Sequence, residues 1–384
     1  MISSHNLSAC RSPFQLPGRT AEERRATVSP PGRAGGYIHN RNWRWIVTTT
    51  LLVAALAVLF AFRWRREGFD WGDFAATFAE LRWGWLGAAA ALSVASYFGR
   101  ALRWAIFIRP LRPDVSVWRL FSATAIGFTA IVIFGRPGEV VRPYLIAVKE
   151  KVPFSSQAAA WILERIYDLL AALLIFGFAL ARIGHSGMHV GRRLEWVLKT
   201  GGYFVAIVGV ICLIILTFLH LYGEVMRRRL LDAISILPPT YHRKAEHLVG
   251  AFVQGAQATR QPSALAKVIG YTFLEWAIIA ACQFCLFRAF PDLAGFRLTD
   301  ILIFLGFVAF GSVVQIPGVG GGMQLVAIFV LTELFHVPLE LASSLAIVLW
   351  LVAFVVIVPF GIFLLFREGL NWKKIKEMEA EASV

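Results

Sequence analysis

The chain carries little charge for its length. Of its 384 residues, 16% are Asp, Glu, Lys or Arg, whereas a soluble globular chain carries about 25%. Hydrophobic residues make up 58% of the chain, and the mean hydropathy is +0.65. The short alternating segments of a membrane β-barrel are also missing, and apolar runs of about 20 residues recur instead. This composition excludes a soluble globular protein and predicts an all-α, polytopic integral membrane protein.

Cysteine and the usual cofactor motifs are scarce. The C-x-x-C formed by Cys282 and Cys285 lies inside an apolar run, with no second pair and no nearby histidine. We therefore interpret these cysteines as small packing residues. The chain has no P-loop, no dinucleotide fingerprint and no D-x-D motif. We expect neither a metal nor a cofactor, and no recognisable catalytic motif favours an enzyme.

Residues 1–44 lack the apolar core that is typical of a signal peptide, and the charge that is present in the chain is mostly basic. The net charge is +14. The basic residues flank the apolar runs, which is the pattern of the positive-inside rule and of attraction to anionic headgroups. This placement argues against nucleic-acid binding. We read residues 1–44, rich in Arg, Pro, Gly and Ser, as a disordered basic cytoplasmic tail.

The apolar runs define a transmembrane domain over residues 45–366, followed by a cytoplasmic tail at 367–384. We expect a cytoplasmic amphipathic segment at 223–261 and a loop at 63–82. Arg100 and Arg103, near the end of a predicted helix, are expected to extend toward the inner membrane face. The roughly seven to nine hydrophobic helical segments are predicted at 45–62, 83–108, 120–134, 157–181, 202–221, 264–290, 300–315, 323–334 and 341–366.

Two of these segments are predicted to be re-entrant hairpins. If every run crossed the membrane, the basic stretch 223–261 would lie outside, so residues 120–134 must enter and return. A second break, Ile316 to Gly322, contains Pro317 and several glycines and cannot be regular helix. Broken backbone at membrane depth must be buried or line a wet cavity. The two breaks enter from opposite sides, which is typical of inverted repeats with a site near the midplane.

The first break contains a charged motif, Gly135-Arg136-Pro137-Gly138-Glu139-Val140-Val141-Arg142-Pro143. Charges inside membrane segments cost several kcal/mol unless they are paired or hydrated, so they mark a functional site by default. A helix that begins at this break directs free N–H groups into the membrane domain. Arg136 and Arg142 add two guanidinium groups suited to a lipid phosphate.

A second charged cluster follows in the next predicted helix. Glu164 and Asp168 share a helix face, and Arg165 can pair with Asp168. With Arg136, Glu139 and Arg142 they include three cations and three anions. One interpretation is a closed, neutral ion-pair network that fixes the hairpin to its neighbour. The other is a network that opens to accept a headgroup. Glu275, in another apolar run, is expected either to face a cavity or to form an interhelical hydrogen bond.

These motifs carry a family resemblance. Gly135 to Glu139 with Arg142-Pro143, then Glu164-Arg165 with Asp168, then Pro317-Gly318 with Gly320, resemble the lysylphosphatidylglycerol synthase transmembrane-region family, also called flippase-like membrane proteins. The resemblance covers roughly residues 45–366. In the multiple peptide resistance factor, this region moves an aminoacylated phospholipid between leaflets, and a separate soluble domain makes that lipid. The chain looks like a stand-alone member without that domain.

The chain departs from the family pattern at one point. The family usually reads Pro-Gly-Gly-x-Gly followed by a glutamate, but Val319 replaces the second glycine and Gln324 stands at the glutamate position. The lost carboxylate puts proton coupling or contact with a cationic headgroup at this site in doubt. The predicted substrate-binding residues are Arg136, Glu139, Arg142, Glu164, Arg165, Asp168, Pro317, Gly318, Gly320 and Gln324.

The resemblance implies a lipid flippase or lipid-transport protein of the bacterial plasma (inner) membrane, with both termini cytoplasmic. Its substrate would be a phospholipid, an aminoacyl-phospholipid or a polyprenyl-phosphate lipid. The alternatives are a membrane-embedded glycosyl- or aminoacyl-lipid transferase, with Glu139 or Glu164 as base, and a non-catalytic partner of a glycosyltransferase. The expected partners are membrane lipids, a lipid-modifying enzyme or glycosyltransferase, and a second copy of the chain.

Overall fold

Long apolar helices make up most of the structure. The computed structural model describes residues 69–185, 200–217, 250, 260–312, 315–316, 318 and 320–369. Its longer elements are α2 (Trp71–Ala79), α3 (Trp83–Ile108), α4 (Val117–Phe134), α5 (Val141–Glu150), α6 (Phe154–His185), a helix at Thr200–Thr217, α9 (Pro262–Ala289), α10 (Leu298–Gly311), α11 (Gly322–Glu333), α12 (Leu339–Trp350) and α13 (Val358–Arg367). The tails, the predicted first helix at 45–62 and most of the segment 223–261 lie outside the described residues.

The described residues contain five helices long and apolar enough to cross a membrane: Val117–Phe134, Phe154–Ile183, Thr200–Thr217, Pro262–Ala289 and Leu339–Arg367. Two shorter apolar helices, Leu298–Gly311 and Gly322–Glu333, accompany them. A bilayer core is about 30 Å thick, which about 20 helical residues span. The prediction of an all-α, multi-pass membrane protein is confirmed.

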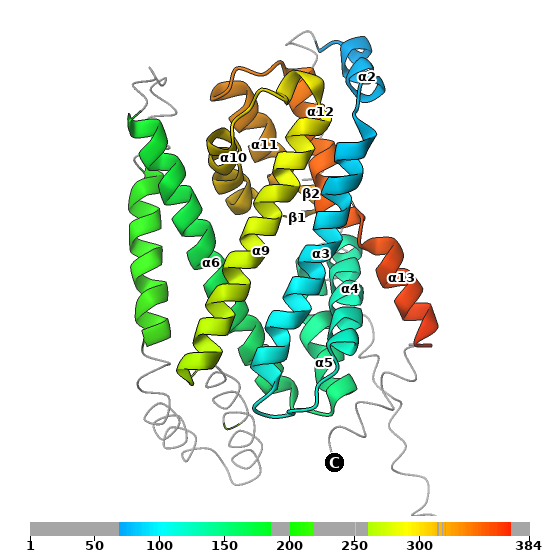
Figure 1. The fold of residues 1–384 in the computed structure, drawn as a ribbon, viewed down its shortest axis with the longest axis vertical. Coiled ribbons are helices and arrows are strands. Elements are labelled where there is room, and N and C mark those ends of the chain that lie inside the picture. The colour runs from blue at the N-terminus through cyan, green and yellow to red at the C-terminus, as the bar shows by residue number, and fades with distance from the viewer. Residues whose placement is uncertain are drawn as a thin grey trace, which may run out of the picture. The chain divides into compact units, whose positions relative to one another are not determined.

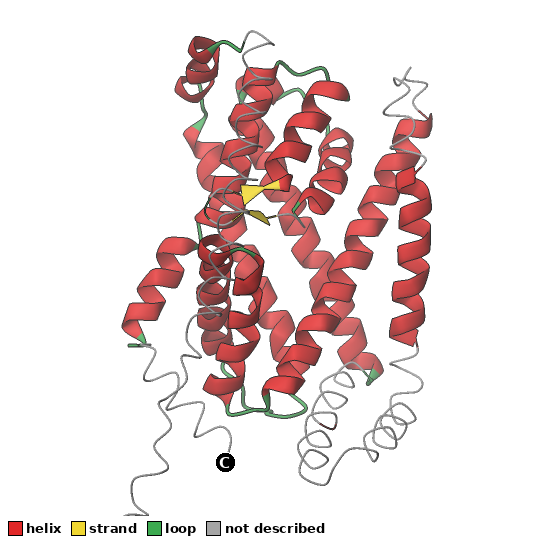
Figure 2. Ribbon diagram, turned by 180° about the vertical axis from the view of Figure 1, so that it is seen from behind, coloured by secondary structure: helices red, strands yellow, loops and turns green. Residues whose placement is uncertain are grey.

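Two helical hairpins enter this arrangement from opposite ends (Figure 1). In the first, α4 turns back through a 3₁₀ helix, η1 (Arg136–Val140), into α5. In the second, α10 leads into two short strands, β1 (Gln315–Ile316) and β2 (Gly320–Gly321), and then into α11. The strands are antiparallel, with Gln315 opposite Gly321 and Ile316 opposite Gly320, and Figure 2 shows them between the helices. This is the arrangement that the prediction of two broken hairpins related as inverted repeats requires.

The buried apolar residues form two separate clusters, one around each hairpin. The first cluster, around the second hairpin, contains Phe287, Phe304 and Leu345 with residues of α10, α11 and α12. The second cluster, around the first hairpin, contains Trp104 and Leu120 with residues of α4, α5 and α13. Helices α3, α6 and α9 contribute to both clusters. Asp168 of α6 and Glu275 of α9 therefore lie along the chain between positions that belong to the two cores, whereas Arg100, Arg103 and Glu164 lie among positions of the second cluster.

The open end of the first hairpin is fixed by ion pairs. Glu150, the last residue of α5, accepts from Arg119 of α4 at 2.8 and 3.2 Å and lies 3.4 Å from Arg112. Lys149 pairs with Glu368, just beyond α13, at 2.6 Å. These contacts connect the end of α5 to the beginning of α4 and to the end of α13. The base of this hairpin is therefore braced by its neighbours.

Two predictions about elements were wrong. The segment 63–82 was expected to be a loop, but residues 71–79 form α2, because Asp70 caps its first turn by accepting from the Gly72 amide at 2.6 Å. The segment 341–366 was expected to be one helix, but a π-helical turn, η4 (Leu351–Val355), interrupts it. Ser93 and Tyr97 of α3 donate to the carbonyls of Val352 and Ala353 at 2.7 and 2.5 Å. Side chains of α3 thus satisfy acceptors that the irregular turn presents.

Candidate functional site

The tip of the first hairpin is shaped by two glycines. Helix α4 ends at Phe134 and is followed by Gly135, whose φ of 71° is easily reached only by glycine. Gly138 lies against the backbone carbonyl of Ala130, where a side chain would collide. Pro143 falls in the first turn of α5, where its missing N–H costs no helical hydrogen bond. The motif is therefore a tight reversal that continues into a second helix.

The tips of the two hairpins touch each other. The Gly318 amide donates to the Val132 carbonyl at 2.9 Å. Arg136 donates to the carbonyl of Ser312, at the end of α10, at 2.9 Å, and also pairs with Glu139. Residues separated by more than 170 positions are thereby joined at one place. The predicted meeting of the two breaks is present in the structure.

Arg142 contacts side chains of three neighbouring helices, α3, α4 and α6. It donates to both carboxylate oxygens of Glu164 at 2.9 and 3.1 Å and to the hydroxyl of Thr124 at 3.2 Å. Its guanidinium carbon lies 4.2 Å from the centre of the Trp104 ring. Glu164 is fully buried and Arg142 nearly so. A buried ion pair is weak evidence for stability, but an unpaired charge there would cost several kcal/mol.

Helix α3 supplies two further arginines to this cluster. Arg103 donates to Asp168 at 2.6 and 3.1 Å and lies 3.2 Å from Glu164. Arg100 pairs with Glu275 of α9 at 2.7 Å. The prediction that Arg100 and Arg103 extend to the inner membrane face was wrong, because Arg103 is fully buried among three carboxylates. Glu275 belongs to the cluster through ion pairs between helices.

The predicted neutral network is therefore larger and carries a net charge. Arg165 joins it through Glu164 at 2.9 Å and Asp168 at 3.5 Å. Among the described residues, four guanidinium groups and three carboxylates leave one positive charge, and the Arg136–Glu139 pair adds none. The cluster comprises Arg100, Arg103, Arg142, Arg165, Glu164, Asp168 and Glu275.

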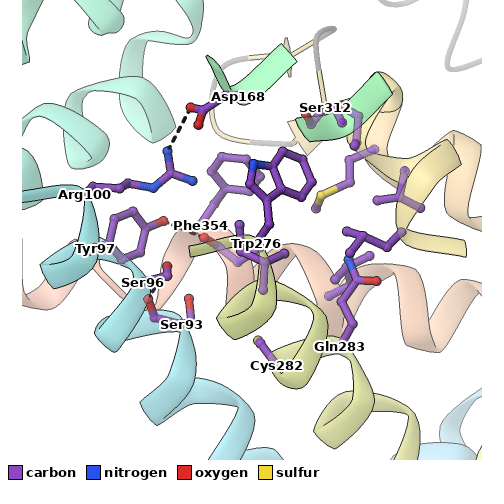
Figure 3. A pocket seen from close by; sticks show the side chains of 18 of the residues that line it. Ser93, Ser96, Tyr97, Arg100, Asp168, Trp276, Cys282, Gln283, Ser312 and Phe354 are labelled. Atoms are coloured by element: carbon purple, nitrogen blue, oxygen red, sulfur yellow. Dashed lines mark hydrogen bonds and ion pairs between the residues drawn. The ribbon is translucent and has the colours of Figure 1, made fainter. Parts of the chain in front are cut away.

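A cavity of about 330 Å³ opens beside this cluster. Three arginines reach its wall, and their side chains are 15%, 42% and 39% exposed for Arg100, Arg136 and Arg165. Figure 3 shows Arg100 and Asp168 at one side of the cavity, with Trp276 and Gln283 of α9 in view. Its polar lining is Ser93, Ser96, Tyr97, Arg100, Arg136, Arg165, Asp168, Trp276, Gln283 and Ser312.

The predicted site residues separate into two groups. Arg136, Arg165 and Asp168 line the cavity, whereas Arg142 and Glu164 are buried in the ion-pair cluster beneath it and Glu139 pairs with Arg136. Gly318 is exposed at the second tip, Gly320 is buried and Pro317 lies outside the described residues. The binding roles of these residues stay predictions.

Gln324 has a local structural role at the second tip. Its Oε1 accepts from the amide of Gly321 at 2.6 Å, at the beginning of α11. The second hairpin contributes Ser312 and Met323 to the cavity wall in its place. The position at which the family usually has a glutamate is therefore occupied by a helix-capping amide.

Sequence reasoning missed Arg100 and Arg103 as members of the cluster. The available signal was their spacing of three residues, which places both on one face of α3. Ser93, Ser96 and Tyr97 extend the same polar face toward the cavity. A run of polar side chains along an otherwise apolar helix indicates a face turned to a protein interior or cavity.

Comparison with known proteins supports the resemblance drawn from the motifs. The chain is 30% identical over 101 residues to a protein named "Glycosyltransferase AglD" from Haloferax volcanii. The matched residues make up 26% of this chain and 16% of that protein. No solved structure matches the chain. The family described as "Lysylphosphatidylglycerol synthase TM region" matches residues 46–361. The chain therefore belongs to the lysylphosphatidylglycerol synthase transmembrane-region family.

Proposed function

We propose that this protein binds an anionic membrane lipid with its headgroup in the cavity between the hairpin tips and moves it between leaflets. The observation that carries the proposal is the presence of Arg100, Arg136 and Arg165 at one cavity wall, beside a cluster with a net positive charge. Guanidinium groups hold phosphate oxygens in bidentate fashion and stay charged when partly buried. The phosphate is assigned to these exposed arginines, while Arg142 holds Glu164 beneath them.

An apolar groove next to the cavity supports a lipid as the ligand. The groove has a volume of about 780 Å³ and lies among α6, α9 and α10. Trp276 lines both the groove and the polar cavity. A ligand with its phosphate at the arginines could therefore extend a hydrocarbon chain past Trp276 into the groove. A soluble anion would leave this surface unused.

The proposed setting is the bacterial plasma membrane, with both termini cytoplasmic. The hairpins, which enter from opposite ends and meet at the site, provide the two halves that alternating access needs. In this proposal, Asp168 and Glu164 hold the arginines when the cavity is empty, and the lipid phosphate competes with Asp168 for Arg165.

The experiment is lipid translocation in proteoliposomes that contain a fluorescent anionic phospholipid. Arg136→Gln removes a cavity charge whose side chain is 42% exposed, so the folded protein should persist while translocation falls at least tenfold. Arg109→Gln is the matched control, since Arg109 is an exposed arginine just beyond α3 and outside the cavity lining. Equal translocation by Arg136→Gln and the unmodified protein would overturn the proposal.

A second candidate function is a role in glycosyl transfer to a lipid. The observation that favours it is the match to a protein named as a glycosyltransferase, which covers 16% of that protein. In this case the chain either acts in the transfer or assists a separate enzyme. Lipid mass spectrometry of a deletion strain separates the candidates, because loss of a modified lipid favours transfer and an altered leaflet distribution of unchanged lipids favours translocation.

A further inference from the structure

The cavity offers positive charge at one side without a free carboxylate to balance it. Arg100, Arg136 and Arg165 reach the wall. Asp168 is the carboxylate that lines the described cavity, and its two oxygens already accept from Arg103 at 2.6 and 3.1 Å. A lipid phosphate fits this side. A headgroup amine placed here would lie near three guanidinium groups and would have to compete with Arg103 for its counter-charge.

The other carboxylates near Asp168 do not offer a free negative charge to a headgroup amine either. Glu164 and Glu275 are 0% and 2% exposed and lie behind the arginines that they bind. Glu139 pairs with Arg136. Each carboxylate of the described cluster is therefore within ion-pair distance of an arginine, and the cluster as a whole keeps one excess positive charge. Replacing these arginines with a lipid amine would leave buried guanidinium groups unpaired, which is costly.

The part of the cavity wall formed by α9 carries neutral polar side chains instead of arginines. Trp276 and Gln283 are seven residues apart, so they lie on the same side of the helix, and Figure 3 shows both among the residues lining the cavity. Gln283 is only 5% exposed. Within the described part of the chain, neither the Trp276 Nε1 donor nor the Gln283 Oε1 acceptor has a hydrogen-bond partner, although both atoms are buried. A buried polar atom without a partner costs about 1–3 kcal/mol, which a ligand group could recover.

These two atoms require opposite partners. Trp276 can only donate, and the free oxygen of Gln283 can only accept. A hydroxyl group satisfies either atom because it both donates and accepts, whereas an ammonium group can serve only the glutamine. A headgroup with more than one hydroxyl, as in glycerol or a sugar, offers groups that suit either atom.

We propose that the cavity selects a lipid whose phosphate carries a neutral hydroxyl-bearing group, such as glycerol or a sugar, and discriminates against lipids whose headgroup carries an amine. The phosphate binds at Arg100, Arg136 and Arg165, and the hydroxyls bind at Trp276 and Gln283. This inference rests on the proposed function, since it specifies the headgroup bound at the same site.

The test is equilibrium binding of short-chain lipids to the purified full-length protein in detergent. The lipid probes are phosphatidylglycerol, which has headgroup hydroxyls, phosphatidic acid, which has none, and lysylphosphatidylglycerol, which adds amines. Glycerol 3-phosphate, which has no acyl chain, is the soluble probe. Phosphatidylglycerol should bind at least tenfold more tightly than lysylphosphatidylglycerol. Gln283→Leu should weaken phosphatidylglycerol binding by about three- to tenfold, the value of one hydrogen bond, and leave phosphatidic acid unchanged.

Two further variants keep the test interpretable. Gln261→Leu makes the same chemical change at an exposed position before the first turn of α9, outside the cavity lining, and should bind all three lipids like the unmodified protein. Trp276→Phe removes only the N–H donor and retains a ring, so it serves if Gln283→Leu does not fold. It should also weaken phosphatidylglycerol binding selectively.

The outcomes separate the two proposals. If none of the anionic lipids binds, or if glycerol 3-phosphate binds as tightly as phosphatidylglycerol, the proposed function is wrong. If lysylphosphatidylglycerol binds as tightly as phosphatidylglycerol, the headgroup selection is wrong and the lipid site stands. If phosphatidylglycerol and phosphatidic acid bind equally and neither α9 variant changes this, the hydroxyl-binding part is overturned.

Discussion

The amide of Gly318 donates a 2.9 Å hydrogen bond to the carbonyl of Val132, so the two hairpin tips are joined through their backbones. Arg136 strengthens the junction by donating to Ser312. The cavity lies at this junction, since Arg136 and Ser312 both line it. If the protein moves a headgroup between leaflets by alternating access, as proposed, we expect the tips to separate during transport.

A cross-link between the tips should stop translocation. The Gly318 amide and the Val132 carbonyl are 2.9 Å apart, so the two backbones approach closely, and a disulfide needs a Cα separation of about 5.5 Å. A cysteine at Gly318 has open space around it, at a cost of about 1 kcal/mol for its positive φ. We expect the oxidised Val132→Cys/Gly318→Cys protein to lose translocation and to regain it on reduction. Each single-cysteine variant is the control. Continued translocation in the oxidised double variant would show that the tips do not need to separate during transport.

Removing the charge of Glu164 should destabilise the protein strongly. Glu164→Gln leaves Arg142 and Arg103 with a neutral partner in a fully buried place. Breaking a buried ion pair costs about 3–5 kcal/mol, so thermal unfolding in detergent should occur at a clearly lower temperature.

The double variant Arg142→Met/Glu164→Leu distinguishes structural pairing from other effects of the Glu164 substitution. Because both charges leave together, it should recover part of the stability that Glu164→Gln loses. A double variant less stable than Glu164→Gln would contradict this account. Thermal unfolding of all three proteins under the same conditions makes the comparison.

A side chain at Gly138 should open the first hairpin. Its Cβ would collide with the backbone carbonyl of Ala130, which cannot move without disturbing α4. Gly138→Ala should therefore lower the free energy of unfolding by about 1–3 kcal/mol. Gly270→Ala is the control, because Gly270 lies in α9 with open space around it and alanine favours helix by up to about 1 kcal/mol. Equal stability of the two variants would argue against close packing at the tip.

Restoring the family's usual glutamate should not change lipid preference. Gln324→Glu keeps an oxygen that can accept from the Gly321 amide and adds a negative charge at the beginning of α11, which is worth about 0.3–1 kcal/mol. Because Gln324 is outside the cavity lining, the relative affinities for phosphatidylglycerol and lysylphosphatidylglycerol should stay as they are. A gain in affinity for the amine-bearing lipid would instead place position 324 within reach of the headgroup.

Hydrophobic runs were enough to predict most helices, because membrane helices must be long and apolar. The run 264–290 corresponds to α9 at Pro262–Ala289. The first hairpin was predicted from the placement of the basic residues, and the second from the Pro/Gly block at 316–322. Helix α2 was missed because it is short and amphipathic, although Asp70 before Trp71 is a recognisable N-cap.

The charged cluster could be predicted only in part. Arg142, Glu164 and Asp168 are conspicuous as charges in apolar surroundings, but the sequence does not reveal which face of α3 meets α6 and α9. Arg103 near a helix end was therefore consistent with either solvent or a buried ion pair. Only tertiary packing shows that it lies between Asp168, Glu164 and Glu275.

The separation of the apolar core into two clusters has a mechanical consequence. Each hairpin is packed within its own cluster, while the continuous helices α3, α6 and α9 contribute to both. The tips of the two hairpins meet through the hydrogen bonds from Gly318 to Val132 and from Arg136 to Ser312. Moving one hairpin tip away from the other would leave most close packing within each cluster undisturbed. The contacts that must change are polar, and water or a headgroup can replace them at a net cost of about 1 kcal/mol each. The layer proposed to bind the headgroup is thus also the layer along which the protein can change shape most easily.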